Sequence, residues 1–344
     1  MEEFEKVVRL HRPEAGLEGV IVIHSTLLGP GAGGCRLWQY DGDEARLRDA
    51  KRLAQGMSYK SALAGLPLGG AKAVLERPRG RFDRARFFRA FGEEVERLGG
   101  SYVTAEDVGT TVDDMSEVGY ATRHVAGLPV RGNRIGGDPS PHTARGVFEA
   151  MQAAVRMRLG GGLEGVTIGV QGLGNVGRAL CELLAQAGAR LIVADINAKH
   201  VAWAERFLKA KPADPDKILA SKVDVLAPCA LGPAFDWRNV AQVRAAIICG
   251  AANNQLAAPE NGDNLARAGV TYVPDYVANA GGIINVAGEY LRWDDSAVEA
   301  RITAIGDRVR VILGEARSSG MAPNRVADAM ARRLVAARDL AVVA

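Results

Sequence analysis

Apolar positions along the chain alternate between short β-rich runs and longer stretches with helical spacing. Residues 19–25 (GVIVIHS) and 71–76 (AKAVLE) are compact apolar runs typical of strands. Residues 41–65 instead repeat apolar side chains three and four positions apart, which predicts a helix carrying Leu47, Ala50, Leu53, Ala54 and Met57 on one stripe. Asp83 is placed to cap a second helix with the apolar face Phe87, Phe88, Phe91, Val95 and Leu98.

The second half of the chain has a more regular alternation. Residues 101–111 read as a strand running into a loop, and glycines and prolines punctuate 127–141, which marks a candidate domain boundary. Thr143 is then expected to cap a helix. From residue 165 onward strands and helices follow one another, at 165–170, 175–188, 190–195, 198–210, 223–228 and 245–251. This order predicts an α/β fold with a doubly wound parallel sheet.

A glycine-rich turn with the pattern G-x-G-x-x-G follows the strand at 165–170 and opens the next helix. The following strand ends in an acidic residue about twenty positions later, which completes the dinucleotide-binding fingerprint. A turn that binds nothing is disfavoured because the strand and helix context is also present. The acidic side chain would accept hydrogen bonds from the adenosine ribose and repel a 2′-phosphate, so NAD is favoured over NADP. The expected cofactor-binding residues here are Gly172, Gly174, Asn175, Val176, Gly177 and Asp195.

Composition narrows the possible functions of the 344-residue chain. The formal net charge is only +3 with both signs interspersed, so neither a nucleic-acid stripe nor an acidic tail is expected. The four cysteines are far apart and lack zinc-site spacing, so no metal is expected. The first residues lack the apolar core of a secretory signal, and no apolar run approaches a membrane span. We therefore expect a cytoplasmic protein without membrane partners.

Lys72 follows the glycines of the segment GLPLGGAKAVL (65–75). A phosphate-binding Walker A loop has its lysine directly after the second glycine and a hydroxyl residue next, and it precedes a helix. Here Ala71 intervenes, Ala73 takes the hydroxyl position, and a strand follows. An ATP-binding module is therefore excluded, and Gly69–Gly70 is expected to form a turn that brings backbone close to a ligand.

Lys60 and Asp107 are two further candidates. On the predicted helix Lys60 follows Met57 by three positions and shares the stripe of Leu53, and a lysine on a buried stripe needs an anion. The alternative is a helix-end lysine whose ammonium reaches water. Asp107 lies on a glycine-containing loop after a strand, where a turn or capping aspartate is the alternative.

Seven segments together carry a family resemblance, in order and over nearly the whole chain. They are GAGGCRLW (31–38), GMSYKSALAGLPLGGAKAVL (56–75), YVTAEDVGTTVDDM (102–115), GDPSPHTARGV (137–147), GVQGLGNVG (169–177), GAANNQL (250–256) and YVPDYVANAGGIINVAGE (272–289). They resemble the Glu/Leu/Phe/Val amino-acid dehydrogenases, and more narrowly the leucine and valine dehydrogenases.

The resemblance implies a reversible oxidative deamination of an L-amino acid to the 2-oxo acid and ammonia, with reduction of NAD. It implies a substrate domain at 1–130, joined by a C-terminal helix at 322–344, facing a Rossmann-type NAD-binding domain at 131–321 across a cleft. It also implies a homo-oligomer. The amino acid and the 2-oxo acid would then be the small-molecule partners.

Residue roles follow from matching positions in the family pattern. Lys72 matches the catalytic lysine, Asp107 the aspartate that moves protons with it, and Lys60 the lysine that binds the substrate carboxylate. A lysine activates water only when it is neutral, and burial or a second cation such as Lys60 favours that form. The other substrate-binding positions implied are Gly33, Gly34, Met57, Ile283 and Val286. Thr143 and Asn254 match residues near the nicotinamide amide and ribose.

Three positions depart from the family pattern. Ala71 replaces a glycine and is expected to narrow the space beside Lys72, while His142 and Gly288 replace an apolar and an acidic residue. The apolar Ile283 and Val286 disfavour glutamate, because its side-chain carboxylate would lack a cation. Leucine, valine and isoleucine are the expected substrates, with phenylalanine as the alternative. A non-catalytic NAD-binding protein on the same scaffold is the alternative of another class.

Overall fold

The computed structural model describes residues 4–129, 136–230, 232 and 234–342, with side chains described up to residue 337. The chain forms two compact units. The first comprises residues 1–139, 285–298 and 331–344, and the second comprises 140–284 and 299–330. The boundary expected between residues 130 and 131 lies outside the described residues. The last helix, α11 (Pro323–Val342), divides between the units, with residues from 331 onward in the first.

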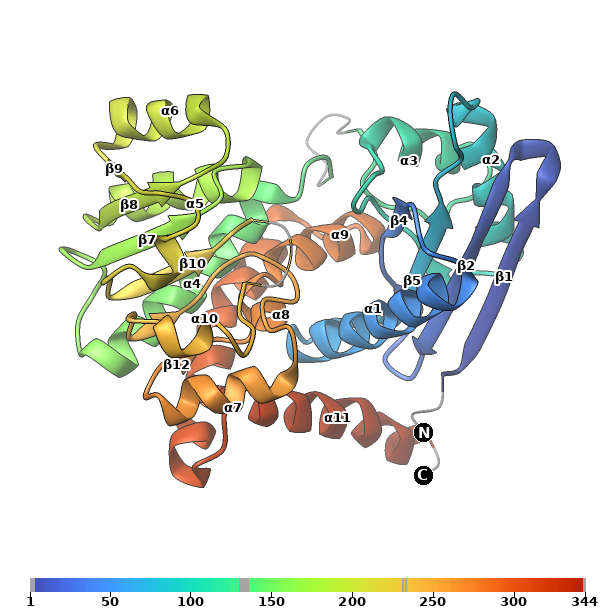
Figure 1. Ribbon diagram of the computed structural model, residues 1–344. Coiled ribbons are helices and arrows are strands. Elements are labelled where there is room, and N and C mark those ends of the chain that lie inside the picture. Colours follow the sequence, from blue (N-terminus) through green and yellow to red (C-terminus); the bar gives the residue numbers. More distant parts are fainter. Residues whose placement is uncertain (1–3, 130–135, 231, 233, 343–344) are drawn as a thin grey trace. The chain divides into compact units, whose positions relative to one another are not determined.

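The first unit is built on a mixed sheet, which has six strands among its described residues (Figure 1). The strand order is β1-β2-β5-β3-β6, and β4 also pairs with β5. β1, β2 and β5 are antiparallel neighbours, whereas β3 and β4 run parallel to β5. The bounds are β1 Lys6–Arg12, β2 Leu17–Ser25, β3 Gly31–Ala32, β4 Cys35–Trp38, β5 Gly69–Glu76 and β6 Tyr102–Val103.

Helices cover both faces of this sheet. One face packs on α1 (Asp43–Leu63) through Val20, Val22 and Val74. The other packs on α2 (Arg84–Glu96) and α3 (Val112–Gly119), whose buried apolar side chains join those of β2 and β5 in one core cluster. The predicted cap and apolar face of α2 are confirmed. The Asp83 carboxylate accepts a hydrogen bond from the Arg86 N–H at 3.0 Å, and Phe87, Phe88, Phe91 and Val95 are buried while Leu98 is partly buried.

The predicted helix at 41–65 is confirmed as α1, and Ala50 and Ala54 of the predicted stripe are buried as expected. Leu53, Met57 and Lys60 are only half-buried, and small side chains make up much of the buried face: Ala50, Ala54, Ser58 and Ser61. These residues recur at helical spacing just as the larger ones do. Close packing on the sheet selects small side chains because glycines line the facing strand β5.

The second unit contains a fully parallel sheet in the order β12-β11-β10-β7-β8-β9. Numbered along the chain, this is the 3-2-1-4-5-6 order of the doubly wound dinucleotide-binding fold, and it confirms the predicted fold class. The strands are β7 Thr167–Gln171, β8 Arg190–Ala194, β9 Lys211–Pro212, β10 Val225–Pro228, β11 Ile247–Ile248 and β12 Thr271–Tyr272.

The helices α4, α5 and α6 lie close to where the sequence places them, and further helices follow. They are α4 Ser140–Leu159, α5 Asn175–Gln186, α6 Ala198–Leu208, α7 Pro259–Arg267, α8 Asp275–Ala278, α9 Gly281–Leu291 and α10 Asp295–Ser319. The capping role expected for Thr143 is wrong, because α4 already begins at Ser140 and Thr143 lies within its first turns. Pro141 is compatible with that earlier start, since the first helical turn does not need its missing N–H. Within the described part of the chain, no helix has the length and apolar character needed to cross a bilayer.

Candidate functional site

Lys72 and Asp107 form a buried ion pair in the first unit. Lys72 lies in β5 and Asp107 follows β6, and their Nζ and Oδ2 atoms are 3.0 Å apart. The lysine side chain is only 6% exposed and the aspartate 18%. Two residues that are far apart in sequence are thus brought into direct contact, at a depth where each charge needs the other.

The Asp107 carboxylate is held as an anion. Burial by itself would raise its pKa, but the nearby cations of Lys72 and Arg36 outweigh burial and hold the pKa below its usual range. The main chain at this position is also fixed, because the Asp107 N–H donates to Thr110 Oγ1 at 2.9 Å. The backbone carbonyls of Cys35 and Asp107 both lie within hydrogen-bond distance of the same hydroxyl. The carboxylate therefore has little freedom to move.

Gly33 and Gly34 allow three chain segments to meet beside this pair. A Cβ at Gly33 would lie 1.9 Å from the Ala71 carbonyl oxygen and 3.2 Å from Met57 Cγ. A Cβ at Gly34 would lie 2.5 Å from the Glu106 carbonyl oxygen and 2.9 Å from Asp107 Cβ. These glycines therefore place bare backbone next to Met57, the Lys72 strand and Asp107, and their contact with substrate stays a prediction.

The expected turn at Gly69–Gly70 is wrong, because both glycines lie inside β5. Their role is close packing of the sheet. A Cβ at Gly69 would lie 2.0 Å from the Ser25 carbonyl oxygen, and a Cβ at Gly70 would lie 2.0 Å from the Ser58 nitrogen on α1. The strand that carries Lys72 is thus seated directly on the α1 backbone.

The methyl group of Ala71 points away from Lys72. Successive side chains of a strand alternate between faces, and Ala71 belongs to the core cluster on the α2 side, whereas Val74 packs on the α1 side. Lys72 shares the face of Val74. The expectation that Ala71 narrows the space beside the lysine is therefore wrong.

Lys60 lies in the last turn of α1 and is half-buried. Complete burial, which the sequence pattern suggested, is thus not observed. The same helix carries Met57, whose Cγ would lie 3.2 Å from a Cβ at Gly33, so α1 lies beside the glycine segment.

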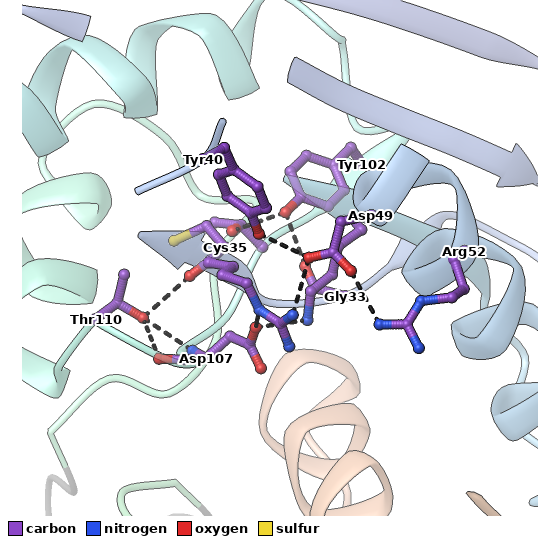
Figure 2. A network of polar contacts seen from close by, with 11 residues as sticks. Gly33, Cys35, Tyr40, Asp49, Arg52, Tyr102, Asp107 and Thr110 are labelled. Carbon is purple, nitrogen blue, oxygen red and sulfur yellow. Dashed lines mark hydrogen bonds and ion pairs between the residues drawn. The ribbon is translucent and has the colours of Figure 1, made fainter. Parts of the chain in front are cut away.

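Arg36, on β4, is a central residue that the sequence interpretation missed. Its Nε lies 3.1 Å from Asp107 Oδ2, and its Nη1 lies 3.0 Å from Asp49 Oδ2. Asp49 also accepts a hydrogen bond from Tyr40 Oη at 2.6 Å (Figure 2). The only signal in the sequence is that Arg36 falls within the segment GAGGCRLW, together with the expected substrate-binding residues Gly33 and Gly34.

Glu289 on α9 is a second missed residue. Its carboxylate accepts hydrogen bonds from the Gly127 N–H at 2.8 Å and the Leu128 N–H at 3.0 Å. These contacts tie the end of α9, which carries Val286, to the first unit. Burial raises the pKa of Glu289, and the two backbone N–H groups oppose that effect.

The glycine fingerprint in the second unit adopts the geometry expected for a pyrophosphate-binding turn. Gly172 has a left-handed φ of 92°, and a Cβ there would lie 2.7 Å from the Ala230 nitrogen. A Cβ at Gly177 would lie 2.0 Å from the Gly172 carbonyl oxygen, whereas one at Gly174 would meet nothing within 4 Å. Gly174 is the N-cap of α5 and supplies no side-chain cap, and Asn175 and Val176 begin that helix. The first N–H groups of α5 are therefore suited to an anion.

Asp195 lies directly after β8 and is joined to this turn. Its carboxylate accepts hydrogen bonds from the Leu173 N–H at 2.6 Å and the Asn197 N–H at 2.7 Å. Burial acts to raise the pKa of Asp195, but these hydrogen bonds and nearby His200 leave it below the usual range. The residues present thus fit a dinucleotide, with an anionic carboxylate fixed beside the glycine turn.

The remaining expected cofactor and substrate positions lie on α4, on α9 and in the loop after β11. Thr143 is half-buried near the start of α4, where the His142 carbonyl oxygen would be only 1.9 Å from a Cβ at Gly281. Asn254 has a left-handed φ of 55° in the loop after β11. Ile283 and Val286 are three residues apart on α9 and so share one helix face, with Gly288 buried further along.

Gln255 fixes the unusual backbone at Asn254. It is fully buried, its side-chain amide donates to the Gly250 and Ala252 carbonyl oxygens, and its N–H donates to Asp275. Among the residues that the structure describes, no cluster of three or more His, Cys, Asp and Glu side chains could hold a metal ion.

Comparisons with known proteins agree with this geometry. Residues 5–124 match the family model for the Glu/Leu/Phe/Val dehydrogenase dimerisation domain, and residues 138–199 and 193–333 match the model for glutamate/leucine/phenylalanine/valine dehydrogenase. A leucine dehydrogenase of Bacillus subtilis is 42% identical over 97% of this chain and 92% of its own length. A phenylalanine dehydrogenase of Bacillus thermotolerans is 37% identical over 98% of this chain and 90% of its own length.

A solved structure extends the match to the fold. The crystal structure of L-tryptophan dehydrogenase from Nostoc punctiforme aligns with a TM-score of 0.85 and 35% identity, covering 98% of this chain and 97% of the other. Sequence and fold thus agree over nearly the whole length. The chain belongs to the glutamate/leucine/phenylalanine/valine dehydrogenase family of amino-acid dehydrogenases.

Proposed function

We propose that this enzyme catalyses the reversible, NAD-dependent oxidative deamination of a branched-chain L-amino acid (leucine, valine or isoleucine) to the 2-oxo acid and ammonia. The observation that carries the proposal is the buried Lys72–Asp107 ion pair, in a chain 42% identical to a leucine dehydrogenase. Relatives named for phenylalanine and tryptophan are less similar, at 37% and 38% identity.

The substrate would be held mainly by residues of α1 and the glycine segment. We assign the substrate carboxylate to Lys60 and the space around the α-carbon to Gly33, Gly34 and Met57. Ile283 and Val286 on α9 would contact an apolar side chain. An apolar contact surface favours leucine over glutamate, whose second carboxylate would have to be buried without a cation.

Lys72 and Asp107 would manage the protons of the reaction. Oxidation of the amine leaves a carbon that water must attack, and Lys72 Nζ would take a proton from that water as general base. Asp107 lies 3.0 Å from Nζ, close enough to exchange a proton with the lysine or the departing amine. Asp107, whose side chain is 18% exposed, would pass protons between the water, the intermediate amine and solvent.

The second unit would hold the cofactor, which supplies a hydride acceptor when bound. The amides at the start of α5 would bind the pyrophosphate, Asp195 the adenosine ribose, and Thr143 and Asn254 the nicotinamide end. The anionic Asp195 carboxylate supports NAD over NADP, because a 2′-phosphate would bring a second negative charge against it.

The test is NADH formation, followed by absorbance, with a panel of L-amino acids. We expect turnover with leucine, valine and isoleucine. Lys72→Ala should reduce kcat by about 100-fold or more, while NADH binding measured by fluorescence is retained. Lys6→Ala, which removes an exposed lysine from β1 of the same unit, is the matched control.

The outcomes separate the competing functions. A higher kcat/KM for phenylalanine than for leucine would identify a phenylalanine dehydrogenase. Normal NADH binding without turnover of any amino acid would identify a non-catalytic NAD-binding protein. Lys60→Ala should chiefly raise the KM of the amino acid, and an unchanged KM would contradict the carboxylate assignment.

We also propose a homo-oligomer. The support is that residues 5–124 match a family model described as a dimerisation domain. Light scattering of the purified chain tests this directly, and a monomeric mass at micromolar concentration would contradict it.

A further inference from the structure

Arg36 bridges two carboxylates that belong to different elements. β4, which carries it, runs parallel to β5 with Arg36 paired to Val74, so its side chain emerges on the α1 face of the sheet together with Lys72. There its guanidinium reaches Asp107 after β6 and Asp49 on α1, and the Arg36, Asp49 and Asp107 side chains are each less than a fifth exposed. A planar fork with fixed donors suits this bridging geometry.

Both cations approach the same oxygen of Asp107. Lys72 Nζ lies 3.0 Å and Arg36 Nε 3.1 Å from Oδ2. On the far side, Tyr40 Oη and Arg52 Nη2 contact the Asp49 carboxylate at 2.6 and 3.0 Å (Figure 2). The result is a row of alternating charges, Lys72–Asp107–Arg36–Asp49, that runs from the strand of the proposed base to helix α1.

We propose that Arg36 is a positioning residue, which holds the Asp107 carboxylate as an anion beside Lys72 through Oδ2 and so leaves Oδ1 to exchange protons during the reaction. This inference rests on the proposed function of Lys72 and Asp107. It adds that Lys72 alone cannot fix the position of the Asp107 carboxylate, because Lys72 must change its protonation state while Asp107 stays in place. A guanidinium keeps its charge at every working pH and is therefore a constant anchor.

The other titratable groups facing Asp107 do not supply this anchor. Burial raises the pKa of the Cys35 thiol on β4 to about 12, and burial raises the pKa of the Tyr102 phenol on β6 well above its ordinary value, so both stay neutral. From β5 the facing group is Lys72, and α1 contributes Asp49, which reaches Asp107 through Arg36. Lys60 also lies on α1, but the cations that lower the pKa of Asp107 are Lys72 and Arg36.

The experiment compares the pH dependence of kcat and KM for L-leucine in the wild type and in Arg36→Gln. Without Arg36 the pKa of Asp107 rises, because one of two opposing cations is gone. We expect the acid limb of the kcat profile to move toward neutral pH by about one unit or more, and kcat at its optimum to fall about tenfold to 100-fold. The KM of NAD should stay within about twofold, since kcat is the parameter expected to change.

Further variants separate positioning from a general loss of structure. Arg36→Lys keeps the positive charge but loses the planar guanidinium. Compared with Arg36→Gln, it should return the acid limb of the kcat profile most of the way to its wild-type pH, but recover less of the kcat value. Asp49→Asn keeps Arg36 but removes the second carboxylate that holds its guanidinium. We expect kcat to fall, with a smaller shift of the acid limb than in Arg36→Gln. Arg89→Gln is the matched control, since it removes an arginine–glutamate pair joining α2 to α3 in the same unit. Its profile should overlay the wild type.

A second readout does not depend on turnover. Carboxyl-carbon NMR of the full chain, labelled at aspartate and assigned with Asp107→Asn, reports the Asp107 titration directly. We expect it to move to higher pH in Arg36→Gln. An unchanged titration, or an Arg36→Gln kcat profile that overlays the wild type, would overturn the inference. A wild type that shows no turnover would instead refute the proposed function, while the NMR still decides whether Arg36 sets the charge of Asp107.

Discussion

Gly70→Ala is the most direct test of how the fold positions Lys72. Gly70 lies in β5 two residues before the lysine, where the strand crosses α1. An added Cβ would lie 2.0 Å from the Ser58 nitrogen, 2.3 Å from its Oγ and 2.5 Å from its Cα. Two of these three atoms are backbone, so no side-chain rotation relieves the clash.

The size of the effect follows from these distances. Ordinary contact begins near 3.4 Å, so strand and helix must separate by about 1.4 Å at this point. Overpacking of a rigid core costs ~1–3 kcal/mol, and a clash with backbone belongs at the upper end. A displacement of about 1 Å at a reacting group costs on the order of 100-fold in rate. We therefore expect ~3 kcal/mol of lost local stability and about a 100-fold lower kcat/KM.

Native-state hydrogen exchange of the full chain measures the local stability. Peptides covering β5 and α1 should exchange about 100-fold faster in Gly70→Ala, because each ~1.4 kcal/mol is a factor of ten. Peptides from β7 and α5 in the second unit serve as an internal reference. Gly56→Ala is the matched variant on α1, because a Cβ there meets nothing within 4 Å. It should gain up to ~1 kcal/mol. Wild-type exchange in β5 together with wild-type kcat/KM would refute the reasoning.

Three further predictions concern single positions. Gly177→Ala should destabilise the second unit and abolish NADH binding, because its Cβ would lie 2.0 Å from the Gly172 carbonyl oxygen. Gly174→Ala should have the wild-type melting temperature but bind NADH more weakly than the wild type, and equal NADH binding by the two variants would contradict this. Asp195→Ser should raise the ratio of NADP to NAD kcat/KM by about tenfold or more by removing a like charge, and an unchanged ratio would exclude Asp195 from cofactor choice. Ala71→Gly should cost ~1 kcal/mol in thermal unfolding with kcat within about twofold, whereas a large change in kcat would place its methyl beside Lys72.

The sequence was most informative where local pattern and chemistry coincide. The strand, glycine turn, helix and terminal acid of 165–195 are adjacent in the chain, so their spacing alone predicted β7, α5 and β8. The two-residue strand β3 escaped prediction because its pairing with β5 and β6 is set by partners far away in the sequence. The strand predicted from residue 101 onward is found as β6. The same holds for residues 285–298, which join the first unit through contacts such as Glu289 to Gly127.

Arg36 shows why half of a site can stay hidden in a sequence. An arginine within a short apolar strand resembles a surface residue of an amphipathic strand. Its two partners lie 13 and 71 positions away, and nothing local indicates that both carboxylates converge on it. The buried face of α1 illustrates a different difficulty. The predicted stripe shares Ala50 and Ala54 with the buried face. That the face continues through Ser58, against Gly70, depended on a strand not yet placed against the helix.

Ala71 shows that a departure from a family pattern must be assigned to a face before it is given a function. The alternation of β5 puts Ala71 and Ala73 on the α2 side and Lys72 and Val74 on the α1 side. A Cβ on Gly31 would come within 2.9 Å of the Ala71 methyl, so the two positions share space for one side chain. The chain keeps the volume at 71 and omits it at 31. Because cores tolerate substitutions that keep the total side-chain volume, we assign the alanine at 71 to packing beneath the site, on the face of β5 opposite Lys72.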